Sequence, residues 1–313
     1  MALYDYQGNV VSVTGSEATF QNVLYPDISV ISAPNYPHHD ATVIHGKIWA
    51  FNKPTDGVSK VYTLAGDTLT QYATKQISMY WKTGKELEFK SADYNNNIDA
   101  LLVGNGQATY VPGESYLYVF YEVEDWLNTA GNITFNNCGT YTQIDVSDLG
   151  DKCYGFWAAD NPDNNLVYVS INMFRDIYLI QLGEGANNLG SGTFSNDGNR
   201  FNGSYKVIKH WEQTVFVTGE YGNHGGQAYN GSLYLVNNNN TKNEIYRFIL
   251  NADGSLQIKT VDCSCFMQDG NLQYRYMDGM FILDGYMYSA PLYINNSYHT
   301  GSNKVLLKIK VPE

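Results

Sequence analysis

Two histidine-containing segments hold the residues best suited to chemistry in this sequence. The first is His38-His39-Asp40, and the second is Asn223-His224. When HHDATVIHGKIWAFN is aligned with NHGGQAYNGSLYLVN, His39 coincides with His224, and Asp278 keeps the same spacing in a third such segment. Imidazole and carboxylate groups that converge could bind a divalent cation or the hydroxyls of a sugar. They could equally hydrogen-bond the backbone of neighbouring strands, which is the usual role of polar groups at buried strand ends.

Carboxylates at similar places keep hydrolysis open as an alternative. A glycosidase needs two carboxyl groups on either side of the scissile bond, about 5 to 9.5 Å apart. The candidates by position alone are Asp40, Asp99, Asp160 and Glu220. The sequence marks none of them as an acid with specially tuned surroundings, so a glycan-cleaving enzyme is the second hypothesis rather than the first.

One acidic stretch resembles the start of a calcium-binding loop. Asp93, Asn95, Asn97 and Asp99 place oxygen ligands at every second residue. The stretch lacks the glycine at position six and the bidentate glutamate at position twelve that complete such a loop. An Asn-rich hairpin loop explains the same residues without a metal.

Aromatic side chains supply a further class of candidate. The chain has 27 Tyr, 13 Phe and 5 Trp, and aromatic faces stack on sugar rings. Core packing is the competing explanation for each ring, because large aromatics are mostly buried. The candidates are Tyr36, Trp81, Tyr94, Trp126, Trp157, Trp211 and Tyr221. The predicted ligand-binding set is His38, His39, Asp40, His224, Asp278, Tyr36, Trp157 and Tyr221.

Composition excludes several classes of protein. The 313 residues include 19 Lys and Arg against 31 Asp and Glu, which gives a formal net charge of -12. An acidic surface repels phosphate backbones, so nucleic acid is excluded as an expected partner. Met1 to Val13 has no basic residue and no apolar run, so we expect neither an export signal nor membrane insertion. Four unevenly spaced cysteines, at positions 138, 153, 263 and 265, are expected to be reduced thiols.

The elements that must position these residues are β-strands. Short alternating runs such as KIWAF, LVYVSI and EIYRFIL are separated by Gly, Asn and Asp, and helical periodicity is almost absent. A unit of about 50 to 70 residues recurs, with the pattern G-x-h-Y/W-x in one strand, where h is apolar. The members that we take as equivalent are Ile48, Leu117, Val167, Leu233 and Met287.

The repeated pattern resembles the NHL- and YVTN-type β-propeller repeats over roughly residues 34–311. We therefore predict an all-β chain, with residues 1–18 as an N-terminal segment and 19–313 as one β-propeller. Five four-stranded blades fit the repeat count, and six is the alternative. The last unit ends after about three strands, so a strand within Thr19–Ser32 is predicted to supply its missing outer strand.

The opening MALYDYQGNVVSV resembles tail-associated and adhesin-like proteins of bacteriophages. That resemblance implies a non-enzymatic virion component, a tail or receptor-binding protein made in the cytoplasm and released by host lysis. The expected partner is a bacterial surface glycan or protein, with other phage tail proteins as further partners. A purely structural tail protein is another alternative. No cofactor is expected, and the one that the His and Asp pattern could accommodate is a divalent cation.

Overall fold

The structure of the protein is a computed structural model. It describes residues 3–4, 10–11, 18–24, 28–37, 39–52, 55, 57–80, 86–89, 91–96, 98–104, 115–150, 153–158, 166–171, 176–183, 194–195, 205–212, 225–239, 242–251, 255–262, 268–269, 272–293 and 303–311. Side chains at 3–4, 10–11, 18–24, 153–158, 194–195, 237–239, 242–244, 262, 268–269, 272–276, 278, 291–293 and 303–304 are outside this description.

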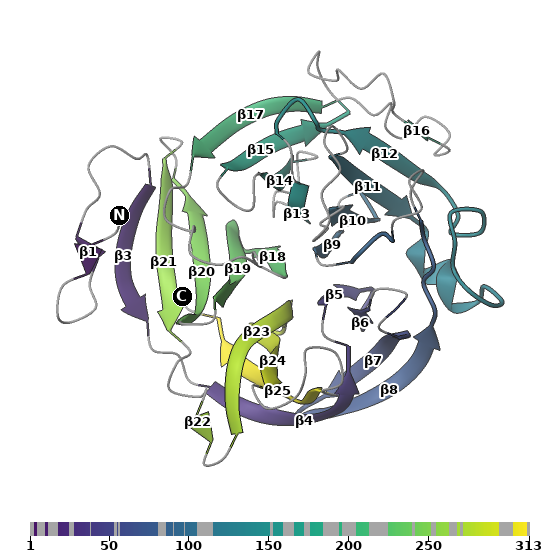
Figure 1. Ribbon diagram of the computed structural model, residues 1–313, viewed down its shortest axis with the longest axis horizontal. Helices are drawn as coiled ribbons and strands as arrows, with labels where there is room; N and C mark the ends of the chain where they lie inside the picture. The colour runs from purple at the N-terminus through teal and green to yellow at the C-terminus, as the bar shows by residue number, and fades with distance from the viewer. Residues whose placement is uncertain are drawn as a thin grey trace.

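The chain forms a five-bladed β-propeller with four-stranded antiparallel blades, so the predicted fold class is confirmed (Figure 1). The blades are arranged radially, and the first strand of each lies nearest the central axis. An isolated four-stranded sheet would leave two apolar faces in water. The radial arrangement buries both faces of every blade against its neighbours.

The strands of each blade run from the axis outwards. Blade 1 contains β5 (Asp40–Ile44), β6 (Lys47–Phe51), β7 (Ser59–Ala65) and β8 (Thr68–Lys75). Blade 2 contains β9 (Ala92–Asn95), β10 (Ala100–Gly104), β11 (Tyr116–Tyr121) and β12 (Tyr141–Asp145). Blade 3 contains β13 (Cys153–Ala158), β14 (Leu166–Ile171), β15 (Asp176–Leu182) and β17 (Tyr205–Glu212). Blade 4 contains β18 (Gly226–Tyr229), β19 (Ser232–Asn239), β20 (Lys242–Leu250) and β21 (Leu256–Asp262). Blade 5 contains β23 (Leu272–Leu283), β24 (Tyr286–Tyr293), β25 (Asn303–Lys310) and β4 (Ile28–Tyr36).

Shorter elements extend this frame. β16 (Phe194–Ser195) pairs with β12, and β22 (Gln268–Asp269) pairs with β23. β1 (Leu3–Tyr4) and β2 (Val10–Val11) form a small sheet of their own. A 3-10 helix, η1 (Val123–Leu127), follows β11. In the described ranges, no helix has the length and hydrophobicity needed to span a membrane.

An N-terminal strand closes the ring, as the sequence predicts. β4 pairs antiparallel with β25, with Ile31 opposite Leu306, and so completes blade 5. The predicted segment, Thr19–Ser32, contains parts of two strands rather than one. The first of them, β3 (Ala18–Leu24), pairs in parallel with β21 as a fifth strand of blade 4. The N-terminal region therefore joins two blades.

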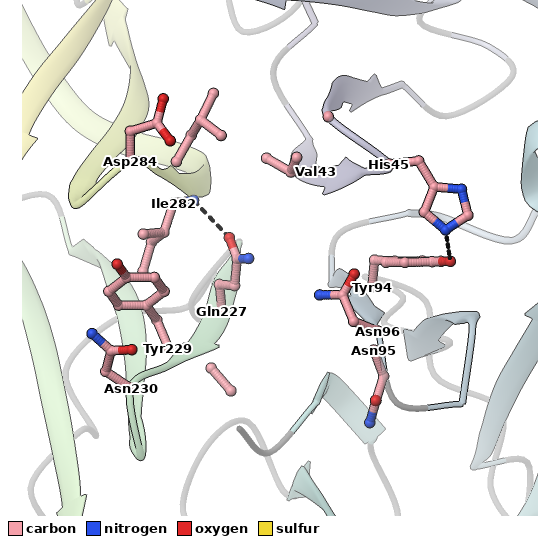
Figure 2. Close-up of a pocket in the computed structure, with 13 residues that line it drawn as sticks. Val43, His45, Tyr94, Asn95, Asn96, Gln227, Tyr229, Asn230, Ile282 and Asp284 are labelled. Carbon is pink, nitrogen blue, oxygen red and sulfur yellow. Dashed lines mark hydrogen bonds between the residues drawn. The ribbon is translucent and has the colours of Figure 1, made fainter. Parts of the chain in front are cut away.

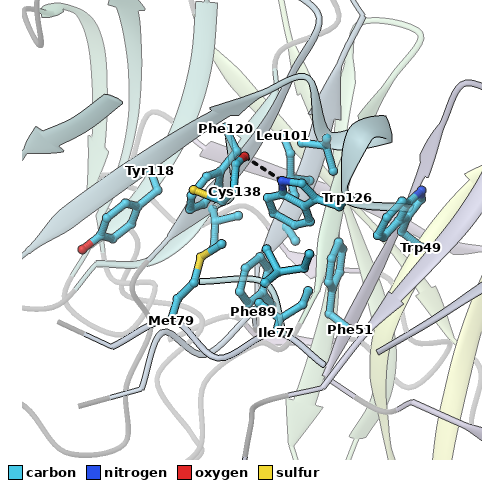
Figure 3. Close-up of a cluster of buried hydrophobic side chains, with 14 of the residues drawn as sticks. Trp49, Phe51, Ile77, Met79, Phe89, Leu101, Tyr118, Phe120, Trp126 and Cys138 are labelled. Carbon is cyan, nitrogen blue, oxygen red and sulfur yellow. Dashed lines mark hydrogen bonds between the residues drawn. The ribbon is translucent and has the colours of Figure 1, made fainter. Parts of the chain in front are cut away.

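The hydrophobic core consists of seams between neighbouring blades, and the described residues form five such clusters. Figure 3 shows the seam between blades 1 and 2, where Phe51 stacks on Phe89 with ring centroids 4.9 Å apart. Trp126 from η1 packs edge-on against Trp49, with centroids 6.1 Å apart, and its indole N–H donates to the carbonyl of Cys138 over 2.7 Å. The alternating apolar residues of each strand thus face the two adjacent seams.

One predicted equivalence is wrong. Ile48, Val167, Leu233 and Met287 lie on the second strands of their blades, but Leu117 lies on β11, the third strand of blade 2. The true second strand is β10, whose residues ALLVG are all buried and include no aromatic residue. Without the aromatic signature, β10 does not match the repeat pattern, whereas the YLYVFY strand that follows it does.

Candidate functional site at the mouth of the channel

Asp40 lies at the closed end of the central channel and joins three blades. Its Oδ1 accepts the backbone N–H groups of Ala41 (2.8 Å) and Met280 (3.1 Å), and its Oδ2 accepts that of Ala92 (2.8 Å). Only 1% of Asp40 is exposed. Innermost strands have a free edge, and this carboxylate satisfies N–H groups along it that would otherwise be unpaired.

Two glycines allow the inner strands to meet at this level. A Cβ placed on Gly225 would lie 2.7 Å from Asp40 Oδ1 and 2.7 Å from the Cα of Gly279. A Cβ on Gly279 would lie 2.9 Å from the Cα of Asp40. Real Cβ atoms do not approach other atoms this closely, so glycine is required at both positions. In the described part of the chain, backbone of blades 1, 4 and 5 therefore meets at this level, where the Asp40 carboxylate also binds blade 2 and fills the channel.

A second layer of polar contacts lies further along the inner strands than Asp40, towards their C-terminal ends. Asp93 Oδ1 accepts the hydroxyl of Thr42 (3.3 Å), and Asp93 Oδ2 accepts the N–H of Ala228 across the axis (3.2 Å). The hydroxyl oxygen of Thr42 in turn accepts the N–H of Tyr94 (3.1 Å). This layer links blades 1, 2 and 4 above the level of Asp40.

Beyond these layers the channel opens into a cavity of about 470 Å³ (Figure 2). Described residues of four blades line it, in two walls that face each other. They are Val43, His45, Gly46, Tyr94, Asn95, Asn96, Gln227, Ala228, Tyr229, Asn230, Ile282, Leu283 and Asp284. The lining side chains are mainly amides, phenols and aliphatic groups, with one imidazole and one carboxylate. The volume is within the range of small-molecule sites, about 300 to 1,000 Å³.

Gln227 is held in a fixed orientation on one wall. Its Oε1 accepts the backbone N–H of Ile282 over 2.6 Å, which joins blade 4 to blade 5. Because a glutamine side chain has one carbonyl oxygen and one NH₂ group, this bond assigns the oxygen to Ile282. Figure 2 shows the remaining amide nitrogen directed towards the cavity.

The opposite wall carries a cluster around His45. Its Nδ1 lies 2.6 Å from Glu124 Oε1, and its Nε2 lies 3.1 Å from Asp99 Oδ1 and 2.8 Å from the hydroxyl of Tyr94. The Tyr94 hydroxyl also donates to Asp99. Burial raises the pKa of Tyr94, and the hydrogen bond to Asp99 and the charges of Asp99 and Glu124 raise it further. The phenol is therefore a neutral donor.

The structure describes two of the four acids proposed for hydrolysis, Asp40 and Asp99, and these two lie apart. Burial raises the pKa of Asp40 well above its ordinary value; the three backbone N–H donors lower it, and the charge of Asp93 raises it. A raised pKa suits a general acid, but both oxygens of Asp40 are occupied and the residue is buried. Asp99 lies beside His45, at the other end of β5, which is roughly 15 Å away at about 3.3 Å per residue. That separation is too large for a glycosidase pair.

The proposed calcium ligands that the structure describes have different partners. Asp93 is buried between Thr42 and Ala228, whereas the side chain of Asp99 is 64% exposed and pairs with His45. Asn95 lines the cavity, and Asn97 lies outside the described residues. Within the described part of the chain, no three His, Cys, Asp or Glu side chains are grouped so that they could hold a metal.

Several of the predicted aromatic candidates belong to the seams. Trp126 and Trp211 are 1% and 2% exposed, so neither offers a ring face to a ligand. Tyr36 is also buried, and it stacks on Tyr62 with centroids 5.3 Å apart. Tyr94 is buried and lines the cavity, and its hydroxyl lies against His45 and Asp99. Among the predicted aromatic residues whose side chains the structure describes, Tyr94 is the one that lines the cavity.

His39 is buried at the start of blade 1, where its N–H donates to the carbonyl of Phe51 over 3.3 Å. Asp278 and Trp157 are on β23 and β13, and their side chains fall outside the described part of the structure. The remaining predicted site residues lie outside the described residues altogether: His38, Trp81, Asp160, Glu220, Tyr221 and His224.

The cavity residues that the sequence prediction missed are mainly polar. They include His45, Asn96, Gln227, Tyr229, Asn230 and Asp284. A signal for three of them is present in the sequence, because His45, Asn230 and Asp284 each precede a glycine between two strands. The predicted site used the start of each inner strand, whereas the cavity lies at its end.

Comparison with known proteins supports the fold. No protein-family model matches the chain, and no curated protein matches it. Among solved structures, it is similar to a calcium-binding regucalcin from Agrobacterium tumefaciens, with 11% identity, 93% of this chain and 97% of that chain covered, and a TM-score of 0.50.

Two other propellers show weaker similarity. The β-propeller domain of Cps50 (Swd1) from Myceliophteria thermophila has 11% identity over 86% of this chain and 67% of that one, with a TM-score of 0.37. The WD40 propeller domain of Doa1 has 13% identity over 91% and 96% of the two chains, also with a TM-score of 0.37. At these identities the similarity concerns the fold alone, and the chain is a β-propeller.

Proposed function

We propose that this protein is a non-enzymatic recognition protein that binds a saccharide in the cavity at the mouth of its channel. The observation that carries the proposal is the lining of that cavity, in which amides and phenols from two facing walls surround a few apolar side chains. Sugars present hydroxyls that both donate and accept hydrogen bonds, together with apolar ring faces. Amide groups match the first property, and aromatic or apolar side chains match the second.

Both walls would contribute hydrogen-bonding groups to the saccharide, and one of them would also contribute apolar surface. The Nε2 of Gln227 supplies a donor whose direction is fixed by the bond from Ile282 to Oε1. Asn96 and Asn230 add exposed amides from opposite walls. The half-buried ring of Tyr229 and the side chain of Ile282 provide apolar surface next to Gln227. A site with few, well-oriented polar groups on apolar walls is typical of a small-ligand pocket.

Binding is favoured over hydrolysis because the described acids are unsuited to act as a pair. Asp40 lies below the cavity with both oxygens engaged, and Asp99 is bound to His45 and Tyr94. Asp284, the one acid among the described lining residues, is on the wall that faces Tyr94. A recognition role requires no pair of this kind.

We further propose that the saccharide belongs to a bacterial surface and that the protein is a bacteriophage tail or receptor-binding component. The support for this finer assignment is the opening MALYDYQGNVVSV and the Tyr- and Asn-rich composition. A direct test is competition, in which purified protein should reduce adsorption of the phage to its host cells. Unchanged adsorption at saturating protein would contradict the virion role and leave saccharide binding as a separate question.

The binding role itself is tested on an array of bacterial surface glycans. The wild-type protein should bind a defined subset of the array, and Asn230→Gly should weaken that binding about fivefold, because one lost hydrogen bond is worth roughly 1 kcal/mol. Glycine tolerates the positive φ of 46° at this position, so the turn is retained. Gln257→Ala, on β21, the fourth strand of blade 4 and away from the cavity, is the matched control and should bind like the wild type. Absence of binding to every glycan would refute the proposal.

A further inference from the structure

Three structurally equivalent turns form much of the rim of the cavity. They connect the first and second strands of blades 1, 5 and 4, at His45-Gly46, Asp284-Gly285 and Asn230-Gly231. Both residues of each turn have positive φ: 45° and 76°, 51° and 77°, and 46° and 68°, respectively. Two-residue hairpin turns with this backbone are type I′ turns. The first residue of each turn lines the cavity (Figure 2).

These first positions share a backbone and differ in chemistry. One presents an imidazole, one an amide and one a carboxylate, namely His45, Asn230 and Asp284. Asn, Asp and His are the non-glycine residues most tolerated at such φ values. Exchange among these types leaves the turn and the blade unchanged, so the rim can alter its selectivity without altering the fold.

The charge of the rim is negative. Even a protonated His45 would carry one positive charge between the carboxylates of Asp99 and Glu124, which are 3.1 and 2.6 Å away. Asp284 adds another carboxylate on the facing wall, and no described residue forms a hydrogen bond or ion pair with it. The described lining residues include neither Lys nor Arg. The whole chain has a net charge of -12, which reinforces the local sign.

We propose that this pocket selects its saccharide by charge: it admits neutral and amine-bearing saccharides and excludes those that carry carboxylate, sulfate or phosphate groups. Asp284 is the residue that determines this selectivity. Its carboxylate accepts hydrogen bonds from hydroxyl or ammonium groups, and it repels an acidic substituent at the same distance. The inference depends on the saccharide-binding function proposed above and adds the chemical class of the ligand.

The experiment compares three proteins on one glycan array that contains neutral, amino and acidic saccharides. Asp284→Asn removes the charge but keeps a side chain of the same shape that tolerates positive φ. Glu212→Gln, at an exposed position on the outer strand β17 of blade 3, makes the same change in net charge away from the cavity. Thermal denaturation of each variant confirms that it is folded before binding is compared.

The wild type should bind neutral and amine-bearing saccharides and leave the acidic ones unbound. Asp284→Asn should lower binding of amine-bearing saccharides about fivefold and raise binding of acidic ones by a similar factor, since a partly exposed ion pair is worth up to about 1 kcal/mol. Glu212→Gln should match the wild type. Preferential binding of acidic saccharides by the wild type, or an unchanged charge preference in Asp284→Asn, would overturn the inference while supporting saccharide binding. No binding to any saccharide would instead refute the proposed function, and the inference with it.

Discussion

At the scale of single residues, polar side chains in the channel act mainly on backbone. Asp40, Asp93 and Gln227 each accept N–H groups from blades other than their own. Such bonds satisfy the free edges of the innermost strands and fix the distances between blades. The cavity exists because these contacts end where the hairpin turns begin.

Gly279 provides a test of the closed end. Gly279→Ala places a Cβ 2.9 Å from the Cα of Asp40, whereas Gly231→Ala meets no atom within 4 Å. Both glycines have positive φ, 59° and 68°, so both variants should lose about 1 to 2 kcal/mol from backbone strain. Gly279→Ala should lose a further 1 to 3 kcal/mol or so from overpacking. Urea denaturation of both variants measures the difference, and equal losses would mean that the strands do not meet at Asp40.

Cys138 provides a test of burial at the seam between blades 1 and 2. Burial raises the pKa of its thiol to about 12, so at pH 8 almost none of it is the reactive thiolate. A variant with serine at positions 153, 263 and 265 leaves Cys138 as the single cysteine. It should react with a disulfide reagent only in denaturant, and the rate should remain low in buffer up to pH 9. Rapid labelling of the folded protein at pH 8 would contradict the packing around Trp126.

At the scale of elements, strand β4 converts an open row of blades into a ring. Its register with β25 brings Ile31 into the seam between blades 5 and 1. Ile31 is 3% exposed, while its neighbour Val30 is 50% exposed. Substitutions at these two positions therefore distinguish the contribution of core packing by β4 from any general effect of changing a residue on this strand.

Ile31→Ala should destabilise the protein by about 3 kcal/mol, as is typical when a large apolar side chain is removed from a core. Val30→Ala, one residue away on the same strand, should change the free energy of unfolding by less than about 0.5 kcal/mol. Chemical denaturation of both variants measures the two changes in the free energy of unfolding. If Ile31→Ala were as mild as Val30→Ala, the closing strand would not belong to the core.

Elements with a strong local pattern could be predicted from the sequence, and those without it could not. Strands such as Lys47–Phe51 and Leu166–Ile171 alternate apolar and aromatic residues, and the shortage of a fourth strand at the C-terminus indicated closure by the N-terminal region. β10 was missed because it is short and buried on both faces, so its sequence has no alternation. Pairing of β3 with β21 depends on tertiary packing that no local pattern records.

The site was harder to predict than the fold, for a geometric reason. The repeat shows that the inner strands converge, but it does not show which end of the channel is open. That depends on Gly225 and Gly279, whose lack of side chains lets backbone close the end that contains Asp40. The polar residues at the start of β5 are therefore enclosed, and those in its turn with β6 are accessible.

At the scale of the whole molecule, the protein is a ring of five blades, in which the described inner strands fill the channel at the level of Asp40 and surround a cavity at their other ends. Apolar side chains pack between neighbouring blades, and polar side chains hydrogen-bond the inner strands to one another near the axis. The turns between first and second strands line the cavity. The first residues of these turns differ in type, whereas the blades repeat the same strand arrangement. This division explains how a stable frame can present a selective surface.

The proposed function places a saccharide in the cavity between the wall of Tyr94 and the wall of Gln227. The most direct measurement is a crystal structure of the protein with the strongest glycan from the array. We expect a sugar ring within hydrogen-bonding distance of Gln227 Nε2, with contacts to Asn230 and Asp284. A sugar bound on an outer strand of a blade, with the cavity empty, would contradict it.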